Sequence, residues 1–350
     1  MSSDPNILFV TTQFRTGERI YPIIPFLAKN YNLDLLKTYH MHPSKGKWGG
    51  DKDLRKVFDK KYKSFFELEF SEVNQINFSK YNLIITDDCR LESGMGEIYT
   101  KRQCLLLGNC HGNNAYYYPI KNLNKCFDGC FVFGRQELSH SHLIPGGVPS
   151  NDSLVNYKNK EKKHILIVTN FIKQGWTDSN GFTFIPNDKK FFDGIDILKI
   201  QQHYNKPVII KIKSREMRNY NGDYNDDVEF IKSCLPEGLD YKILVDVEDD
   251  NLLIAESEVV IGHGSTMMLK PLQLGIPTAI IKEYGYTDQG SSIYGDCKAV
   301  VDLDHQKIMK VLTHTDHSEF ILNAVEGGIE FNSIKYYLNY IKYIIDNARN

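Results

Sequence analysis

The sequence EVVIGHGSTMMLKPLQLGIPTAII, residues 258–281, decides the fold of this chain. It begins with a continuous apolar run, Val259 to Ile261, which is typical of a strand buried on both faces of a parallel sheet. A glycine-containing turn, 262–266, follows, and apolar residues then recur at helical spacing up to Gly275. A second apolar run, 278–281, predicts another buried strand. The stretch therefore predicts a strand, a tight turn, a helix and a strand, as in α/β folds.

The turn at 262–266 combines glycines with hydroxyl side chains at the point where the helix begins. We expect free backbone N–H groups there, because the first N–H groups of a helix have no partner within it. Gly264 would let a ligand approach the backbone, and Ser265 and Thr266 would add hydrogen bonds. A phosphate group suits such a place. A Gly-x-Gly turn before a helix is also common in proteins that bind no phosphate.

The layout of 258–281 resembles the donor-phosphate segment in the C-terminal domain of GT-B-fold glycosyltransferases and of their relatives, the CDP-glycerol glycerophosphotransferases and UDP-N-acetylglucosamine 2-epimerases. In those families a small-Gly-x-x-Ser-Thr turn opens a helix that closes with Gly-x-Pro before the next strand. The matching residues here are Gly262, His263, Gly264, Ser265, Thr266, Gly275 and Pro277. Many members carry a glutamate on this helix that holds the nucleotide ribose. This chain has Lys270 there, which could reach a phosphate instead.

Length and composition fit a globular protein of two domains. The chain has 350 residues, 41% of them hydrophobic, and a formal charge of -2, which gives no general attraction to nucleic acid or membrane. No apolar run approaches the length of a membrane span and the first residues are polar, so we expect a cytoplasmic protein without an integral membrane segment. The seven cysteines form no Cys-x-x-Cys pair, which favours reduced thiols over disulfides or a zinc site.

Buried strands recur in both halves of the chain and are separated by a polar segment without periodicity, 150–163. We therefore expect an N-terminal, acceptor-side Rossmann-like domain over 1–155 and a C-terminal, donor-binding one over 160–330. The resemblance implies parallel sheets that face each other across a cleft, as in the GT-B fold, and a C-terminal helix, 331–350, that packs back on the first domain. Its apolar stripe suits packing, with attachment to a membrane surface as the alternative.

Polar loops follow the N-terminal strands, at the end of the sheet where α/β proteins bind ligands. The strand 83–86 ends at Asp87 and Asp88, and these carboxylates could act in the site or cap the next turn. Another strand delivers His111 beside a glycine, a segment that is similar to the His-Gly motif of the CDP-glycerol glycerophosphotransferases. The histidine of that motif is the general base on the acceptor hydroxyl. His111 is therefore the predicted base, with Asp88 as the second candidate.

Other loops supply further candidates for the donor pocket. In the resembled families the loop after the first strand, which here contains Gly17, faces the cleft. Lys213 and Arg215 end a strand where related transferases carry a His-Pro-x motif, and either could counter a diphosphate, with a surface basic pair as the alternative. Asp288 or Gln289, in the polar loop after the second strand of the opening stretch, could hydrogen-bond a sugar.

Acidic residues elsewhere are explained by helix caps. Asp302-Leu303-Asp304 matches the Asp-x-Asp metal motif of another glycosyltransferase fold only superficially, because it follows a strand and precedes a helix. We predict a strand end and an N-cap there, and a second N-cap at Asp249. We expect no metal site in this chain.

A basic region from Lys45 to Lys63 interrupts the α/β pattern. Its cationic residues outnumber the acidic ones, and Trp48, Phe58 and Tyr62 lie among them. Charge runs of this kind usually form a solvated surface. The alternative is a patch that receives a polyanionic acceptor, such as a nucleic acid, a phosphorylated glycan or a lipid head group.

These features together predict a metal-independent glycosyltransferase that needs no cofactor and takes a nucleotide sugar as donor, with a UDP-linked donor favoured. Ser265, Thr266 and the helix N-terminus would stabilise the leaving diphosphate, while His111 would remove the proton of the acceptor hydroxyl. Alternatives within the fold are a CDP-glycerol-type glycerophosphotransferase and a nucleotide-sugar 2-epimerase, which would turn over its donor without an acceptor. An alternative of another class is a bilobal sugar-binding protein.

Overall fold

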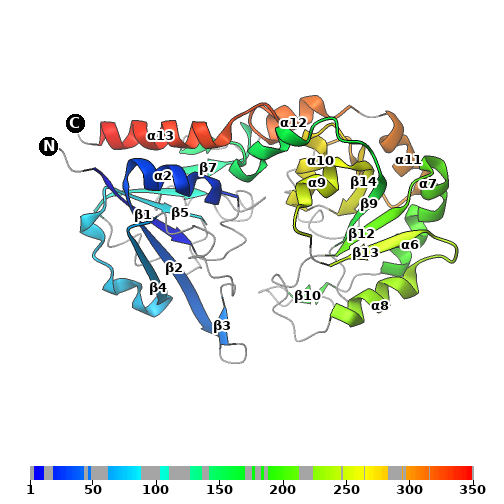
Figure 1. Ribbon diagram of the computed structural model, residues 1–350, viewed down its shortest axis with the longest axis horizontal. Coiled ribbons are helices and arrows are strands. Elements are labelled where there is room, and N and C mark those ends of the chain that lie inside the picture. Colours follow the sequence, from blue (N-terminus) through cyan, green and yellow to red (C-terminus); the bar gives the residue numbers. More distant parts are fainter. Residues whose placement is uncertain are drawn as a thin grey trace. The chain divides into compact units, whose positions relative to one another are not determined.

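The computed structural model describes residues 4–11, 19–42, 46–48, 62–87, 103–109, 127–135, 142–169, 176–177, 183–184, 188–212, 224–245, 247–263, 265–282, 294, 297–314 and 316–348. The chain forms two compact units (Figure 1). Unit 1 consists of Met1–Ser153 and Leu322–Asn350, and unit 2 consists of Leu154–Ile321.

Unit 1 is built on a sheet whose described strands follow the order β3-β2-β1-β5-β6-β7-β8, with β4 also paired to β2. These strands are β1 (Asn6–Thr11), β2 (Asn32–His42), β3 (Gly46–Trp48), β4 (Ser64–Glu69), β5 (Leu83–Thr86), β6 (Leu105–Asn109), β7 (Gly129–Val132) and β8 (Leu143–Pro145). The pairs are parallel except for β2 with β3. Strands after β1 are therefore added first on one side of it and then, from β5 onward, on the other.

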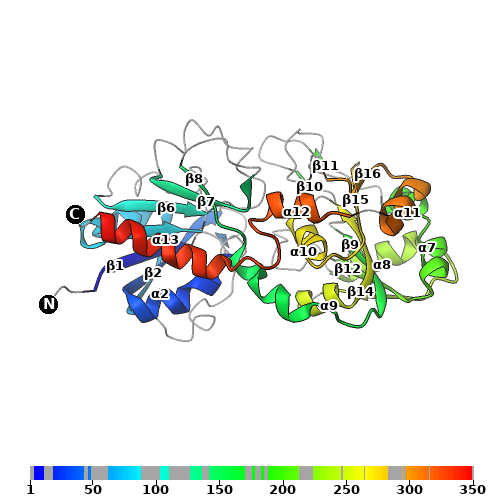
Figure 2. The same cartoon turned by 90° about the horizontal axis from the view of Figure 1, so that it is seen from above.

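Both faces of this sheet are covered, which explains the continuous apolar runs of its strands. The helices α2 (Ile24–Asn30) and α13 (Ser333–Asn347) lie side by side on one face (Figures 1 and 2). The other face packs against the 3-10 helices η2 (Phe70–Gln75) and η3 (Phe78–Lys80). Two further 3-10 helices are η1 (Tyr21–Ile23) and η7 (Pro149–Tyr157).

Helix α13 fits closely against the sheet of unit 1. The ring of its Tyr337 stacks on Phe131 with the ring centroids 3.7 Å apart. Gly146 leaves room for this ring, since a Cβ at that position would lie 2.5 Å from Tyr337 Cε2. The carboxylate of Asp152 accepts hydrogen bonds from the N–H groups of the first two helix residues, Ser333 and Ile334. Helix α13 is therefore held against unit 1 by hydrogen bonds to its first backbone N–H groups and by the packing of Tyr337.

Unit 2 contains a parallel sheet of order β13-β12-β9-β14-β15-β16 within its described residues. Its strands are β9 (His164–Thr169), β12 (Val208–Ile212), β13 (Tyr241–Leu244), β14 (Ser257–His263), β15 (Thr278–Ile281) and β16 (Val300–Val301). A separate antiparallel pair joins β10 (Trp176–Thr177) and β11 (Thr183–Phe184). Its helices are α6 (Asp188–Ile195), α7 (Ile197–Tyr204), α8 (Tyr224–Cys234), α9 (Asp250–Ala255), η9 (Thr266–Met268), α10 (Leu269–Gln273), α11 (His305–His314) and α12 (Ser318–Ala324), whose last residues belong to unit 1.

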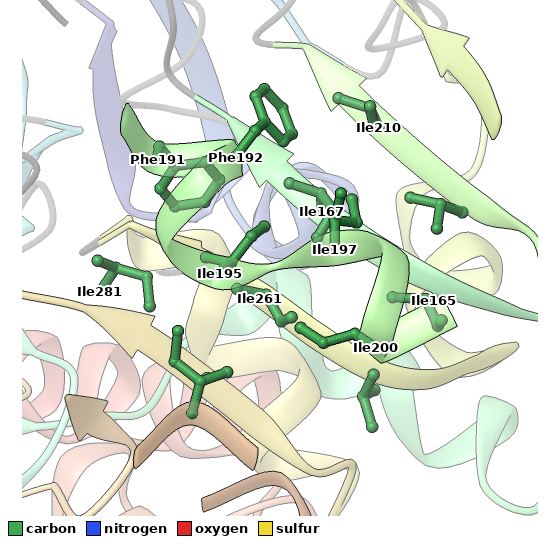
Figure 3. Packing of buried hydrophobic residues seen from close by; sticks show 14 of the residues in the cluster. Ile165, Ile167, Phe191, Phe192, Ile195, Ile197, Ile200, Ile210, Ile261 and Ile281 are labelled. Carbon is green, nitrogen blue, oxygen red and sulfur yellow. The ribbon is translucent and has the colours of Figure 1, made fainter. Parts of the chain in front are cut away.

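The main core of unit 2 lies between the sheet and helices α6 and α7. Phe191 and Ile195 of α6 pack with alternate residues of the strands, such as Ile167 and Ile261 (Figure 3). Complete burial of a side chain of this size contributes roughly 1.5–3 kcal/mol. The apolar runs 259–261 and 278–281 thus become β14 and β15, two neighbouring strands of the sheet. The predicted fold class of two parallel-sheet α/β domains is confirmed.

Two N-caps that the sequence predicts are confirmed. The Asp249 carboxylate caps α9 by accepting from the Leu252 N–H, and Asp304 accepts from the Lys307 N–H at the start of α11.

Cys104, Cys130, Cys234 and Cys297 are free thiols. Within the described ranges no helix is long and apolar enough to cross a membrane. The same ranges contain no group of three or more His, Cys, Asp or Glu side chains placed to hold a metal ion.

A buried histidine at the start of β9 predicts a pH dependence of stability. His164 Nε2 lies 3.0 Å from the Leu253 carbonyl oxygen and 3.1 Å from Ser257 Oγ, and burial lowers the pKa of its ring. As the pH falls, the His164 ring therefore takes up a proton in the unfolded chain before it does so in the folded chain. The stabilisation that comes from the neutral ring is complete above about pH 6.5 and is lost as the pH falls below that value. Urea denaturation should show a smaller loss of stability from about pH 7.5 to about pH 5.5 in His164→Gln than in the wild type. Equal losses in both proteins would contradict the assignment.

Candidate functional site

The strand order of unit 2 marks a place for a ligand. β12 and β13 lie on one side of β9, whereas β14, β15 and β16 lie on the other. In open parallel sheets, ligands bind outside the carboxyl ends of the strands where this order reverses. This place, the switch point of the sheet, is here between β9 and β14. The turn that the sequence singled out leaves β14 at this point. The topology therefore favours this turn as the candidate site of unit 2.

Gly262 is required by the close packing at the end of β14. A Cβ at this position would lie 2.9 Å from the Val168 carbonyl oxygen of β9 and 3.0 Å from Met268 Sδ. The neighbouring backbone and the first helical turn after β14 both approach this residue. The absence of a side chain at Gly262 thus allows the turn to pack closely against β9 at the switch point. The glycine is not required there by an unusual backbone angle.

Ser265 organises the turn that follows. Its N–H donates to the His263 carbonyl oxygen at 2.6 Å, its hydroxyl accepts from the Met267 N–H at 3.3 Å, and its carbonyl accepts from the Met268 N–H at 2.8 Å. The expectation that the N–H groups here are free was therefore wrong for Met267 and Met268, because Ser265 acts as an N-cap. The helix is also shorter than expected, since a 3-10 turn, Thr266–Met268, precedes the α-helical residues Leu269–Gln273.

His263 lies in β14 rather than in the turn. Its side chain is 3% exposed and its ring contacts Phe191 of α6, with the ring centroids 5.1 Å apart. Strand alternation places it on the same face as Ile261. Thr169, at the end of β9, is on this face too, beside Ile167. Its buried hydroxyl makes no hydrogen bond to any described residue. Two polar side chains thus end an otherwise apolar layer at the switch point.

Lys270 is held by the neighbouring helix. Its ammonium donates to Asn251 Oδ1 at 2.8 Å, next to the N-cap of α9. There the Tyr157 hydroxyl donates to Asp249. Partial burial alone would raise the pKa of the Asp249 carboxyl, but hydrogen bonds from the Leu252 N–H and from Tyr157 outweigh it and leave the pKa below its ordinary value. The Lys270 ammonium thus binds the Asn251 amide, and its charge also helps to lower the pKa of the nearby Asp249 carboxyl.

Unit 1 has a switch point of its own, between β1 and β5. Thr11 ends β1, and its hydroxyl donates to Asp87 Oδ2 at 2.6 Å. The Tyr21 hydroxyl lies 2.6 Å from the same Thr11 oxygen, so it donates to Thr11, whose single proton is already used. All three side chains are buried, and Asp87 is 0% exposed. A chain of hydrogen bonds from phenol to hydroxyl to carboxylate therefore spans the switch point.

A second polar contact lies at the end of β6. The Tyr337 hydroxyl of α13 donates to Asn109 Oδ1 at 2.9 Å, and both residues are buried. In the sequence Asn109 precedes the predicted base, His111, by two positions. The C-terminal helix thus contacts the strand from which that residue follows.

Most of the predicted site residues are not among those that the structure describes. These residues are Gly17, Asp88, His111, Lys213, Arg215, Gly264 and Gln289. The structure does bring His263, Ser265, Thr266 and Lys270 to one end of the sheet of unit 2. In the basic region, Lys47 lies in β3 and Lys63 immediately precedes β4, while 49–61 lies outside the described residues.

Sequence reasoning missed Thr11, Tyr21 and Thr169. A signal for the two threonines was present, because the first strand of each unit ends an apolar run with Val-Thr, at 10–11 and 168–169. A polar residue that closes such a run at the carboxyl end of the first strand is a reasonable marker of the switch point. No comparable signal exists for Tyr21, which reaches the site from η1.

Comparisons with known proteins define the fold further. No protein-family model matches the chain, and no curated protein matches it in sequence. Solved structures of UDP-N-acetylglucosamine 2-epimerases do match it, although at low identity. The enzyme from Methanocaldococcus jannaschii has a TM-score of 0.62 and 10% identity over 97% of this chain and 99% of its own. The enzyme from Rickettsia bellii has 0.60 and 12% over 98% of each chain.

A third structure, of the Neisseria meningitidis enzyme bound to UDP-N-acetylglucosamine, has a TM-score of 0.59 and 14% identity over 97% of this chain and 100% of its own. At such identities the likeness establishes a shared fold. The near-complete coverage includes both units and the C-terminal helix. This chain therefore has the two-domain, GT-B-type α/β fold that is found in 2-epimerases of UDP-N-acetylglucosamine.

Proposed function

We propose that this protein is a nucleotide-sugar 2-epimerase that acts on a UDP-linked sugar. The observation that carries the proposal is the match to 2-epimerase structures over 97% of this chain and at least 99% of theirs. The glycosyltransferase expected from the sequence remains the second candidate. It is favoured by the turn after β14, which resembles the donor-phosphate segment of those enzymes, and it would use the same donor site.

In this proposal the turn after β14 receives the diphosphate of the nucleotide. The hydrogen bond from the Met267 N–H to Ser265 Oγ is long, at 3.3 Å, so a phosphate oxygen could replace the Ser265 hydroxyl as its acceptor. The hydroxyls of Ser265 and Thr266 would then donate to the phosphate as well. Such hydrogen bonds would favour departure of the diphosphate, because its negative charge grows as it leaves.

Inversion at carbon 2 of the sugar requires that its hydrogen be removed and returned from the opposite face. Departure of the diphosphate from the adjacent carbon 1 would make that removal possible, because the electron pair left on carbon 2 then forms a double bond to carbon 1. The diphosphate would then add back to carbon 1 while a proton is returned to carbon 2 from the other face, so that the double bond is lost and the bond between carbon 1 and the diphosphate forms again. The reaction needs groups that take up and give back a proton. We propose His111 and Asp88 for this role, and no cofactor is required in this scheme.

The proposal is tested by incubating the purified protein with UDP-N-acetylglucosamine in deuterium oxide, without an acceptor. A 2-epimerase should produce the C2 epimer with deuterium at carbon 2, which proton NMR detects. Turnover that appears only after an acceptor is added would instead identify a glycosyltransferase. Binding of a free sugar without affinity for UDP would indicate a sugar-binding protein. Either of these results would overturn the proposed activity.

Ser265→Ala should weaken UDP binding about tenfold, since it removes one hydrogen bond to a charged group. It should also lower the free energy of unfolding by about 1 kcal/mol, because the variant loses the N-cap. Isothermal titration and urea denaturation measure the two effects. Asn332→Ala is a matched control, because the Asn332 side chain caps α13 in unit 1 by accepting from the Lys335 N–H at 2.8 Å. The control should lose comparable stability and keep its affinity for UDP, and equal affinity in all three proteins would exclude Ser265 from the site.

A further inference from the structure

We propose that Tyr294 is a positioning residue that holds the turn after β14 in the conformation that receives the diphosphate. The inference rests on the proposed function for the identity of the ligand. Its geometry rests on contacts within unit 2 alone. Tyr294 is 0% exposed, and its hydroxyl donates to the Ser265 carbonyl oxygen at 2.7 Å.

The Ser265 carbonyl is held from two sides. It accepts from the Tyr294 hydroxyl and also from the Met268 N–H at 2.8 Å. A carbonyl oxygen has two lone pairs, so these two donors occupy both. The peptide that joins Ser265 to Thr266 is planar and trans, and its N–H therefore points away from its carbonyl. By holding the Ser265 carbonyl, Tyr294 also sets the direction of the Thr266 N–H, at the turn assigned to the phosphate.

The backbone of Tyr294 is itself linked to the edge of the sheet. Its carbonyl accepts from the Cys297 N–H at 2.9 Å, and the Cys297 carbonyl accepts from the Val300 N–H at 3.0 Å. Val300 is the first residue of β16, the edge strand of the sheet. The Tyr294 ring also packs near Phe320 of α12, with the ring centroids 6.2 Å apart. A series of hydrogen bonds thus connects the edge strand, β16, to the turn after β14 at the centre of the sheet.

This arrangement assigns Tyr294 a role that is separate from ligand contact. Its hydroxyl proton is used on a backbone carbonyl, so Tyr294 acts on the phosphate only through Ser265 and Thr266. Phenylalanine at this position would keep the ring and its packing while releasing one side of the carbonyl. The turn should then sample other orientations, and both nucleotide binding and departure of the diphosphate should be weakened.

The test compares Tyr294→Phe with Tyr204→Phe by hydrogen exchange and by nucleotide titration. Tyr204 lies in α7 of the same unit, and its buried hydroxyl makes no hydrogen bond to the described residues. In Tyr294→Phe the amides of Met267 and Met268 should exchange about fivefold faster, as expected for the loss of one buried hydrogen bond. Tyr204→Phe should exchange like the wild type. Unchanged exchange in Tyr294→Phe would overturn the inference.

Binding of UDP separates this inference from the proposed function. Tyr294→Phe should bind UDP about fivefold more weakly and lower kcat/KM for the UDP-sugar by at least a similar factor, whereas Tyr204→Phe should change neither. Faster exchange together with wild-type affinity would show that the hydrogen bond from Tyr294 to Ser265 does not affect UDP binding, and the inference would fail. If the wild type itself binds no UDP, the proposed function fails, whereas the exchange result still decides whether Tyr294 holds the turn.

Discussion

Gly134→Ala is expected to lower the free energy of unfolding by about 3 kcal/mol, the upper end of the usual cost of overpacking. A Cβ at Gly134 would lie 2.6 Å from the carbonyl carbon of Ala324 and 2.7 Å from its oxygen, and closer still to the Asn323 oxygen. All three are backbone atoms, so no side chain can rotate away to make room. The new methyl group must push the segment that leads to α13 away from β7.

The surrounding contacts raise the cost of that displacement. Next to Gly134, the Glu326 N–H donates to the Phe133 carbonyl oxygen at 2.8 Å. The Arg135 guanidinium also binds both carboxylate oxygens of Glu326. A shift of the segment would strain these bonds together. The space at Gly134 is therefore part of the attachment of the C-terminal segment to unit 1.

Urea denaturation measures this effect, with Gly275→Ala as the matched control. Gly275 has a φ of +69°, and a Cβ there would have no atom within 4 Å. Alanine at this position should cost about 1 kcal/mol from the left-handed backbone alone. If Gly134→Ala proved no less stable than Gly275→Ala, the segment after α12 would have to yield without loss, and close packing at Gly134 would not be the reason for the glycine.

Thr11→Val is expected to cost nearly as much, about 3 kcal/mol, although the two side chains have almost the same shape. One hydroxyl serves two buried partners, so its loss removes a donor from the Asp87 carboxylate and an acceptor from the Tyr21 hydroxyl. A hydrogen bond to a charged group contributes about 1.5–3 kcal/mol, and one between two neutral hydroxyls contributes about 0.5–1.5 kcal/mol. The damage is electrostatic, because valine fills the same volume.

Thr38→Val is the control that isolates this effect. Thr38 is also fully buried in the same sheet, but its hydroxyl makes a single long bond, of 3.4 Å, to the Thr11 carbonyl oxygen. Its replacement should change the free energy of unfolding by less than about 1 kcal/mol. Both variants are measured by urea denaturation at neutral pH. If they lost similar amounts of the free energy of unfolding, the hydrogen bonds from Thr11 to Asp87 and Tyr21 would contribute no more than the single long bond of Thr38.

The sequence alone was sufficient where the deciding interactions are local. A run of apolar residues such as 259–261 needs cover on both faces wherever it lies, so the strand and the parallel sheet could be predicted from it. The caps at Asp249 and Asp304 are formed with N–H groups three residues further along the chain. Local reasoning failed where a boundary moved by a few residues. It placed Gly262 and His263 in the turn, whereas both residues belong to β14 and the His263 ring lies near that of Phe191.

Only the tertiary structure decided which distant residues meet. Thr11 and Asp87 are 76 positions apart, and Tyr337 and Asn109 are 228 apart. These pairs exist because β1 lies next to β5 and because α13 packs on the sheet of unit 1. Strand order is set by packing over the whole chain, and no period or cap in the sequence records it. The sequence by itself therefore determined the α/β elements and the glycine turn, whereas the fold decided which polar residues meet at the carboxyl ends of the strands within each unit.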